Sequence, residues 1–262
     1  DHRRQRQMCI RDSDTTQGRV STGLKVASSL DDASAFAVAQ GIRAEVRALD
    51  SVIQGLNNSK AVGKVAVAGA TAVSNLMIDI RQKLTELANS SITASQRTII
   101  QRDFTELVSQ AANFVSNATY NGFALLTSGA ATVNTLANLA GGQLSLTAQG
   151  NVKLFINSLA GATTTTAANA QSVIVGQFND LETSVAQALG TLGAEVRALD
   201  LQTGFLEELR DTTSVGLGNI VDADLARESA KLTSQQIQQE LSVQTLSIAN
   251  TRPNTILSLF RG

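Results

Sequence analysis

The sequence predicts a mainly α protein, a bundle of long coiled-coil-like helices with a small β-hairpin-bearing segment in the middle. Hydrophobic residues make up 43% of the 262 residues but aromatic residues only 3%, a composition that suits helix seams better than a thick globular core. Long segments repeat apolar residues at alternating spacings of three and four, which is typical of coiled-coil packing. The only proline, Pro253, lies near the end of the chain, so little interrupts these helices.

The first segment, residues 1–17, looks unlike the rest. It carries four arginines and the only histidine and cysteine of the chain, His2 and Cys9, and it shows no helical periodicity. It also lacks the apolar centre of a secretory signal. We expect a non-native or disordered tail here; a native disordered basic arm is the alternative.

Residues 18–120 and 177–218 are predicted to form the two halves of a helical rod domain. Ser28, Ser29 or Asp31 would cap its first helix, and charged residues between the seams, such as Arg97, are interpreted as solvated. We expect the seam residues Leu84, Leu107 and Leu199 to be buried against other helices. The four predicted seams are Val38, Ile42, Val46, Leu49, Ile53 and Leu56; Val73, Met77, Ile80, Leu84 and Leu87; Ile100, Phe104, Leu107, Ala111, Phe114 and Ala118; and Phe178, Leu181, Val185, Ala188, Leu192, Leu199 and Leu206.

Residues 121–176 form a short variable β and loop region in this interpretation, because the helical period disappears there. Asn121-Gly122 is a dipeptide typical of tight hairpin turns. Residues 143–147 and 152–156 alternate apolar and polar side chains like short strands. Thr163 to Thr166 is a low-complexity loop.

Residues 219–262 are predicted to be one long helix, separated from the rod by a flexible break at residues 216–218. Asp222 and Asp224 load its start with negative charge, which the helix dipole favours. Its apolar residues fall on two sides, so we expect a polymerisation helix covered partly by other copies of the chain; a buried terminal helix of a monomer is the alternative. The candidate self-assembly residues are Leu225, Leu232, Ile237, Leu241, Val243, Leu246, Ile248, Leu257, Leu259 and Phe260.

The sequence offers little catalytic chemistry. With His2 as the sole histidine, there is no triad base and no imidazole metal ligand in the body of the chain. Acidic pairs at residues 31–32 and 222–224 are explained by helix capping. We therefore expect no enzyme, no cofactor and no metal. A net charge of −1 argues against nucleic acid as a partner, and the uncharged run 241–251 is shorter than the about 20 residues that span a bilayer.

One heptapeptide occurs twice. Ala44–Asp50 has the sequence AEVRALD, and Ala194–Asp200 repeats it without a change. Recurrence in a coiled coil rich in alanine, leucine, glutamate and arginine is the simplest interpretation, and it supplies no firm physical reason for identity.

Three stretches together resemble bacterial flagellin: Gly18 to Gln40, Asn117 to Leu126 and Ile220 to Arg261. The resemblance implies a structural subunit that polymerises into the extracellular flagellar filament for swimming motility. It also implies export without a cleavable signal peptide, and as partners other flagellin subunits, the export machinery with its chaperone, and hook-associated and cap proteins. A hook–filament junction protein is the alternative within this class; a soluble coiled-coil adaptor or secreted host-signalling ligand is the alternative outside it.

Two further expectations come from the resemblance. The family's N-terminal helix, which pairs with the C-terminal one, is expected to be missing and replaced by residues 1–17. The chain would then stay monomeric or associate weakly, with residues 232–260 largely disordered or loosely helical in solution. The stretch Gln82–Leu87 matches the one that the animal innate receptor for flagellin recognises, with Lys83, Glu86 and Leu87 as candidate receptor-facing residues. Lys83 and Thr85 stand where the family usually has arginines, so we expect recognition to be weak.

Overall fold

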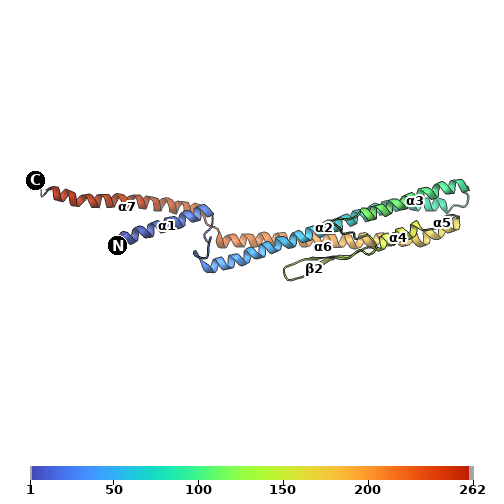
Figure 1. The fold of residues 1–262 in the computed structure, drawn as a ribbon, viewed down its shortest axis with the longest axis horizontal. Helices are drawn as coiled ribbons and strands as arrows, with labels where there is room; N and C mark the ends of the chain where they lie inside the picture. The colour runs from blue at the N-terminus through green and yellow to red at the C-terminus, as the bar shows by residue number, and fades with distance from the viewer. Residues whose placement is uncertain (1, 260–262) are drawn as a thin grey trace. The chain divides into compact units, whose positions relative to one another are not determined.

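The computed structural model describes the backbone of residues 2–259 and the side chains of residues 11–245, and it confirms the mainly α fold (Figure 1). By contact density the chain divides into two compact units, Asp1–Val46 with Asp211–Gly262 (the terminal unit) and Arg47–Arg210 (the central unit). The elements in chain order are α1 (His2–Thr22), α2 (Ala33–Leu87), α3 (Ala94–Asn117), β1 (Val133–Leu136), β2 (Gln143–Leu146), α4 (Asn151–Ala160), α5 (Ala167–Val173), the π-helical turn η1 (Ile174–Phe178), α6 (Asn179–Val221) and α7 (Leu225–Leu259).

The start of α2 is fixed by Asp32. Its Oδ1 accepts hydrogen bonds from the backbone amides of Ser34 at 3.0 Å and Ala35 at 2.9 Å, which satisfies two donors that have no partner within the helix. The predicted cap at Ser28, Ser29 or Asp31 is therefore wrong. The Asp31 carboxylate accepts instead from the amides of Ser28 and Ala27 in the preceding turn. These bonds, with that from the Ser28 amide contributing most, lower the pKa of Asp31.

The central unit is built on α2 and α6, which lie side by side and run antiparallel. Lys60 pairs with Asp200 at 3.0 Å, while Arg81, further along α2, pairs with Glu182, earlier in α6. Every position of the second and fourth predicted seams is buried between helices, including Leu84. These long alternating patterns are thus confirmed, because a stripe of that length faces inward only in one helical register.

The first and third seams are only partly confirmed. Val38, at the start of the first seam, is exposed, and burial there begins at Leu49. Leu107 is half-buried, so its predicted full burial is wrong. The buried stripe of α3 instead contains Phe104, Val108, Ala111 and Val115, whose spacings of four, three and four differ from the predicted seam at two positions.

The repeated heptapeptide marks a local two-fold relation between α2 and α6. Asp50 pairs with Arg210 at 3.4 Å, and Asp200, its counterpart 150 positions later, pairs with Lys60 at 3.0 Å. Lys60 and Arg210 are themselves 150 positions apart. The buried residues Leu49 and Leu56 have the buried counterparts Leu199 and Leu206. Leu49 and Asp50 therefore occupy places on α2 equivalent to those of Leu199 and Asp200 on α6, which gives a physical reason for identity at these two positions of the repeat.

A π-helical turn keeps the apolar seam continuous between α5 and α6. Val173 and Phe178 are both buried although they lie five positions apart, a spacing that an α-helix would turn out of line. The extra residue in η1 corrects this offset. Arg81 lies over the Phe178 ring with its guanidinium carbon 5.4 Å from the ring centre, a cation–π contact that joins α2 to the turn.

The middle of the chain contains one of the two predicted strands. Residues 143–146 form β2, which pairs antiparallel with β1, a strand that the sequence did not suggest. The predicted strand 152–156 is wrong, because these residues belong to α4 with Val152, Ile156 and Leu159 buried along one face. The turn at Asn121-Gly122 is confirmed: both residues have positive φ, 49° and 80°, as a hairpin turn of this type requires.

Both chain ends depart from the sequence expectations. Residues 1–17 are not a disordered tail, since α1 runs from His2 to Thr22 without a break. Residues 216–218 are not a flexible break, since α6 continues to Val221. The break lies at residues 222–224, where Asp224 Oδ1 accepts a hydrogen bond from the Arg227 amide at 3.1 Å and caps α7.

By length and composition alone, α2 also contains a stretch apolar enough to cross a membrane, and a third of that stretch is buried. Ala66, Ala70 and Val73 of α2 lie in the core of the central unit, so its apolar character is explained by helix packing.

Candidate assembly surface on the terminal helices

The terminal unit brings the two ends of the chain together at a short backbone junction. Leu24 and Asp222 form an antiparallel bridge, in which the Lys25 amide donates to the Val221 carbonyl at 2.7 Å and the Ala223 amide donates to the Gly23 carbonyl at 2.9 Å. Gly23 has φ of 72°, a conformation that favours glycine. A small core beside this junction contains Val26, Ala39 and Val221.

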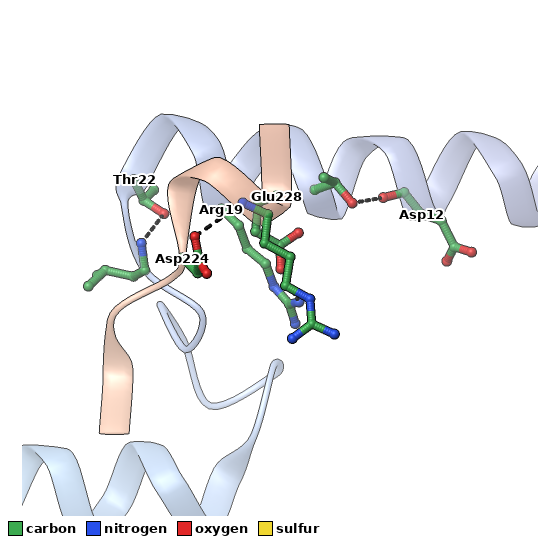
Figure 2. Close-up of polar contacts among 8 residues, drawn as sticks. Asp12, Arg19, Thr22, Asp224 and Glu228 are labelled. Carbon is green, nitrogen blue, oxygen red and sulfur yellow. Dashed lines mark hydrogen bonds and ion pairs between the residues drawn. The ribbon is translucent and has the colours of Figure 1, made fainter. Parts of the chain in front are cut away.

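An ion pair links α1 and α7 beside the junction (Figure 2). Arg19 Nη1 lies 3.4 Å from Glu228 Oε1, and both side chains are largely withdrawn from solvent. The Thr22 hydroxyl accepts from the Leu24 amide at 3.3 Å and closes the end of α1. A helix therefore does pair with α7, and the expectation of a missing partner helix is wrong.

The seam between α1 and α7 is mostly polar over the described side chains. The Gln239 amide donates to the Ser13 hydroxyl at 2.9 Å, and Thr16 is buried with its hydroxyl bonded to the Asp12 carbonyl (Figure 2). On α7 the partly buried residues are Glu228, Leu232, Gln235 and Gln239, whose spacings of four, three and four place them on one face. Leu232 is thus the one apolar member of this face.

Four of the other predicted apolar residues of α7 lie off this seam. Leu225, Ile237, Leu241 and Val243 are between 49% and 67% exposed. At 100° per residue, Ile237 and Leu241 point almost opposite the seam, while Leu225 and Val243 flank it. The side chains of Leu246, Ile248, Leu257 and Leu259, and all of Phe260, lie outside the described residues.

The stretch predicted to face a receptor is only partly accessible. Leu87 is fully buried, so its assignment to an exposed face is wrong. Lys83 pairs with Glu86 at 3.3 Å and with Asp103 of α3 at 3.5 Å. The hydrogen bond to Glu86 contributes most to the raised pKa of Lys83.

Sequence reasoning missed the role of Arg97. Its guanidinium donates to the carbonyls of Leu87 and Asn89, at 2.5 and 3.0 Å, and so closes the carboxyl end of α2 from the first turn of α3. Nothing in the sequence pattern separates such an arginine from a solvated one, because the contact depends on how the chain reverses between the two helices.

The geometry defines a class of protein, a long helical protein with apolar side chains exposed on α7. Among the described residues there is no group of three or more His, Cys, Asp or Glu side chains placed to hold a metal ion. Two family models match the chain, the bacterial flagellin N-terminal helical region over residues 3–132 and the bacterial flagellin C-terminal helical region over residues 175–260. The chain belongs to the bacterial flagellin family.

Relatives and solved structures agree with this assignment. The chain is 32% identical to flagellin FljK of Caulobacter vibrioides, over 94% of this chain and 90% of that one, and 31% identical to a flagellin of Brucella melitensis, over 95% and 92%. A putative flagellar hook-associated protein from Vibrio parahaemolyticus has a similar fold, with a TM-score of 0.61, 17% identity, and coverage of 73% of this chain and all of that one. At that identity the likeness shows the fold alone.

The protein is therefore a structural subunit of the bacterial flagellar filament, where it packs with other flagellin subunits outside the cell. The N-terminal family match begins at residue 3, within the range that sequence reasoning set aside as foreign.

Proposed function

We propose that copies of this chain join in the filament through the exposed apolar side of α7, with Ile237 and Leu241 at its centre. The observation that supports this is the separation of two faces of α7 among its described side chains: the face toward α1 is mostly polar, and the opposite face carries Ile237 and Leu241. Apolar residues placed on the outer side of a helix pair are available only to a partner from another molecule.

The polar seam gives the proposal its energetic basis. The ion pair of Arg19 with Glu228 is partly desolvated, and the cost of desolvation offsets much of the attraction between the two charges. Neutral hydrogen bonds contribute about 0.5–1.5 kcal/mol each. Full burial of Ile237 or Leu241 against a neighbour would contribute about 1.5–3 kcal/mol per side chain. Contacts between copies would thus stabilise α7 more than its contact with α1 does.

The test is seeded filament elongation with the Ile237→Ser, Leu241→Ser double variant. The control is Gln236→Ser, Gln238→Ser, which replaces two exposed residues of the same helix with the same side chain. We expect the apolar double variant to raise the critical concentration for elongation by about two to four orders of magnitude, and the control to change it less than about threefold. Equal critical concentrations for the two variants would remove α7 from the proposed interface.

We also propose that the chain leaves the cell through the flagellar export machinery with a dedicated chaperone, without cleavage of a signal peptide, and that it meets hook-associated and cap proteins at the filament ends. The family assignment supports this route. The measurement is the intact mass of the chain inside the cell and in the medium, in strains with and without a functional flagellar export apparatus. Secretion that persists without that apparatus, or a shorter secreted chain, would contradict the route.

For the innate receptor we propose weak recognition. Lys83 is held by Glu86 and Asp103, and Thr85 supplies no cation, so the planar, bidentate guanidinium contacts of arginine are absent. In a receptor reporter assay, the Lys83→Arg, Thr85→Arg variant should signal about thirtyfold more strongly than the parent. Strong signalling by the parent, at doses where a standard flagellin works, would refute this proposal.

A further inference from the structure

The tight turn at Asn121-Gly122 exposes a chemically labile pair of residues. It is the one Asn-Gly dipeptide in the sequence, and both of its residues are exposed. The Tyr120 amide donates to the Phe123 carbonyl, and the Phe123 amide donates to the Tyr120 carbonyl, each at 2.9 Å. Asparagine is one of the thermally labile residues of proteins. It is most labile before a glycine, because the following backbone nitrogen then has no side chain beside it.

Gly122 leaves that backbone nitrogen unshielded. A Cβ atom added to Gly122 would meet nothing within 4 Å apart from its neighbours in the chain. Among the hydrogen bonds of the described residues, none has the Gly122 amide as donor and none involves the Asn121 side chain. The backbone nitrogen and the side-chain amide carbon are therefore both open to reaction.

The backbone of the closed turn keeps these two atoms apart. Asn121 has φ of 49° and Gly122 has φ of 80°, as in a type I′ turn. In such a turn ψ of the first central residue is about +30°, which directs the next backbone nitrogen away from the side chain. The Gly122 nitrogen reaches Asn121 Cγ only if ψ of Asn121 rotates. That rotation breaks the two hydrogen bonds between Tyr120 and Phe123.

We propose that Asn121 is a site of spontaneous deamidation in this protein, and that the closed turn slows the reaction. In the opened turn, the Gly122 nitrogen gives its proton to hydroxide and bonds to Asn121 Cγ. The bond from Cγ to Nδ2 breaks, and Nδ2 leaves as ammonia after taking a proton from water. Water then opens the cyclic succinimide. Breaking its bond between nitrogen and Cγ gives aspartate, and breaking the bond between nitrogen and the main-chain carbonyl carbon gives isoaspartate.

The products should disturb more than the turn. Aspartate adds a negative charge, and isoaspartate adds a methylene carbon to the main chain, so the paired hydrogen bonds cannot re-form with the same geometry. Leu125 and Leu126 follow the turn and are buried in the core of the central unit. Their carbonyls accept from the amides of Gln149 at 2.6 Å and Lys153 at 3.3 Å. Isoaspartate should therefore loosen this part of the core.

The first experiment compares the full chain in its folded state and unfolded in urea, at the same mildly alkaline pH. Peptide mass spectrometry, with isoaspartate-specific enzymatic methylation, measures conversion at each asparagine. In urea, Asn121 should convert at least about tenfold faster than Asn89, an exposed asparagine followed by Ser90. In the folded chain, Asn121 should convert at least about tenfold more slowly than in urea, because the turn must first open.

Two variants separate the attacking nitrogen from the closed turn. Gly122→Ala adds a Cβ atom beside that nitrogen, so conversion of Asn121 in urea should be at least about fivefold slower than in the parent. Tyr120→Pro removes the amide that donates to the Phe123 carbonyl, so conversion in the folded chain should be at least about threefold faster. Circular dichroism checks that this variant folds.

A measurement on the parent alone tests the turn without any substitution. Urea below the unfolding transition should accelerate hydrogen exchange at the Tyr120 and Phe123 amides and deamidation of Asn121 in parallel. Conversion of Asn121 no faster than that of Asn89 in urea overturns the site. Equal rates for the parent and Gly122→Ala in urea overturn Gly122 as the source of the attacking nitrogen. Equal conversion in the folded and unfolded parent, or deamidation that does not follow amide exchange, overturns the protection by the turn.

Discussion

Gly63 tests how closely the helices pack in the central unit, because it lies in α2 against both α6 and the hairpin. A Cβ atom added there would lie 2.5 Å from Val196 Cγ2 and 3.1 Å from Leu146 Cδ2. Neither neighbour moves easily: valine has a stiff side chain, and Leu146 is buried in the core. Overpacking of this kind costs about 1–3 kcal/mol, whereas replacing glycine by alanine inside a helix gains about 1 kcal/mol. We therefore expect Gly63→Ala to range from neutral to about 2 kcal/mol destabilising.

A matched substitution isolates the steric part of this effect. Gly190 also lies in a long helix, α6, but an added Cβ would meet nothing within 4 Å. Gly190→Ala should therefore stabilise the protein by about 0.5–1 kcal/mol. Since both variants share the gain in helix propensity, the difference between their free energies of unfolding should equal the overpacking cost, about 1–3 kcal/mol. Urea unfolding followed by far-UV circular dichroism measures that difference. Equal stabilisation by the two alanines would refute the close packing of α2 against α6 and β2.

Three further predictions concern the same unit. By urea unfolding, Leu199→Ala should cost about 2–5 kcal/mol and Leu107→Ala clearly less, because only Leu199 is fully buried; equal costs would contradict the packing of α3. Arg97→Ala should cost about 1 kcal/mol, because two carbonyls at the end of α2 lose a charged donor, and an unchanged midpoint would contradict its capping role. The hydrogen bond and the charge of Lys60 lower the pKa of Asp200. The pair therefore stabilises the folded protein above the ordinary pKa of an aspartate, and this stabilisation is lost as the pH falls below about 4. The free energies of unfolding of the parent and of Lys60→Met should therefore differ at pH 7 and converge near pH 3.

The long seams could be predicted from the sequence, and short or polar elements could not. Six seam residues of α6, from Leu181 to Leu206, repeat over several turns, and only one helical register buries them all. Residues 152–156 span a single turn, where a period of two and a period of 3.6 give nearly the same pattern. These residues form a helix because the backbone hydrogen bonds of α4 extend beyond both ends of the segment and because Leu159 is buried one turn later. Neither feature can be recognised from residues 152–156 alone.

The helix α1 escaped prediction for a different reason. Among its described side chains, Ser13 and Arg19 make the contacts with α7 and Thr16 is buried, so no apolar period marks the inward face there. A helix of this kind is recognisable only with its partner beside it. The repeated heptapeptide poses the same difficulty: its meaning lies in the pairing of Asp50 with Arg210 and of Asp200 with Lys60, and each pair joins residues far apart in the chain.

The polar seam between α1 and α7 has a consequence for the proposed assembly. A chain that buried Ile237 and Leu241 against its own α1 would be more stable alone, but it would have used the surface that neighbouring copies need. If Ile237 and Leu241 pack against neighbours as proposed, contacts between copies add to the free energy that orders the terminal helices, so the stability of the terminal unit should rise with the concentration of subunits. The central unit, whose core is buried within one chain, does not share that dependence. The proposed division is therefore physical: one unit folds by itself, and the other is completed by the filament that it helps to build.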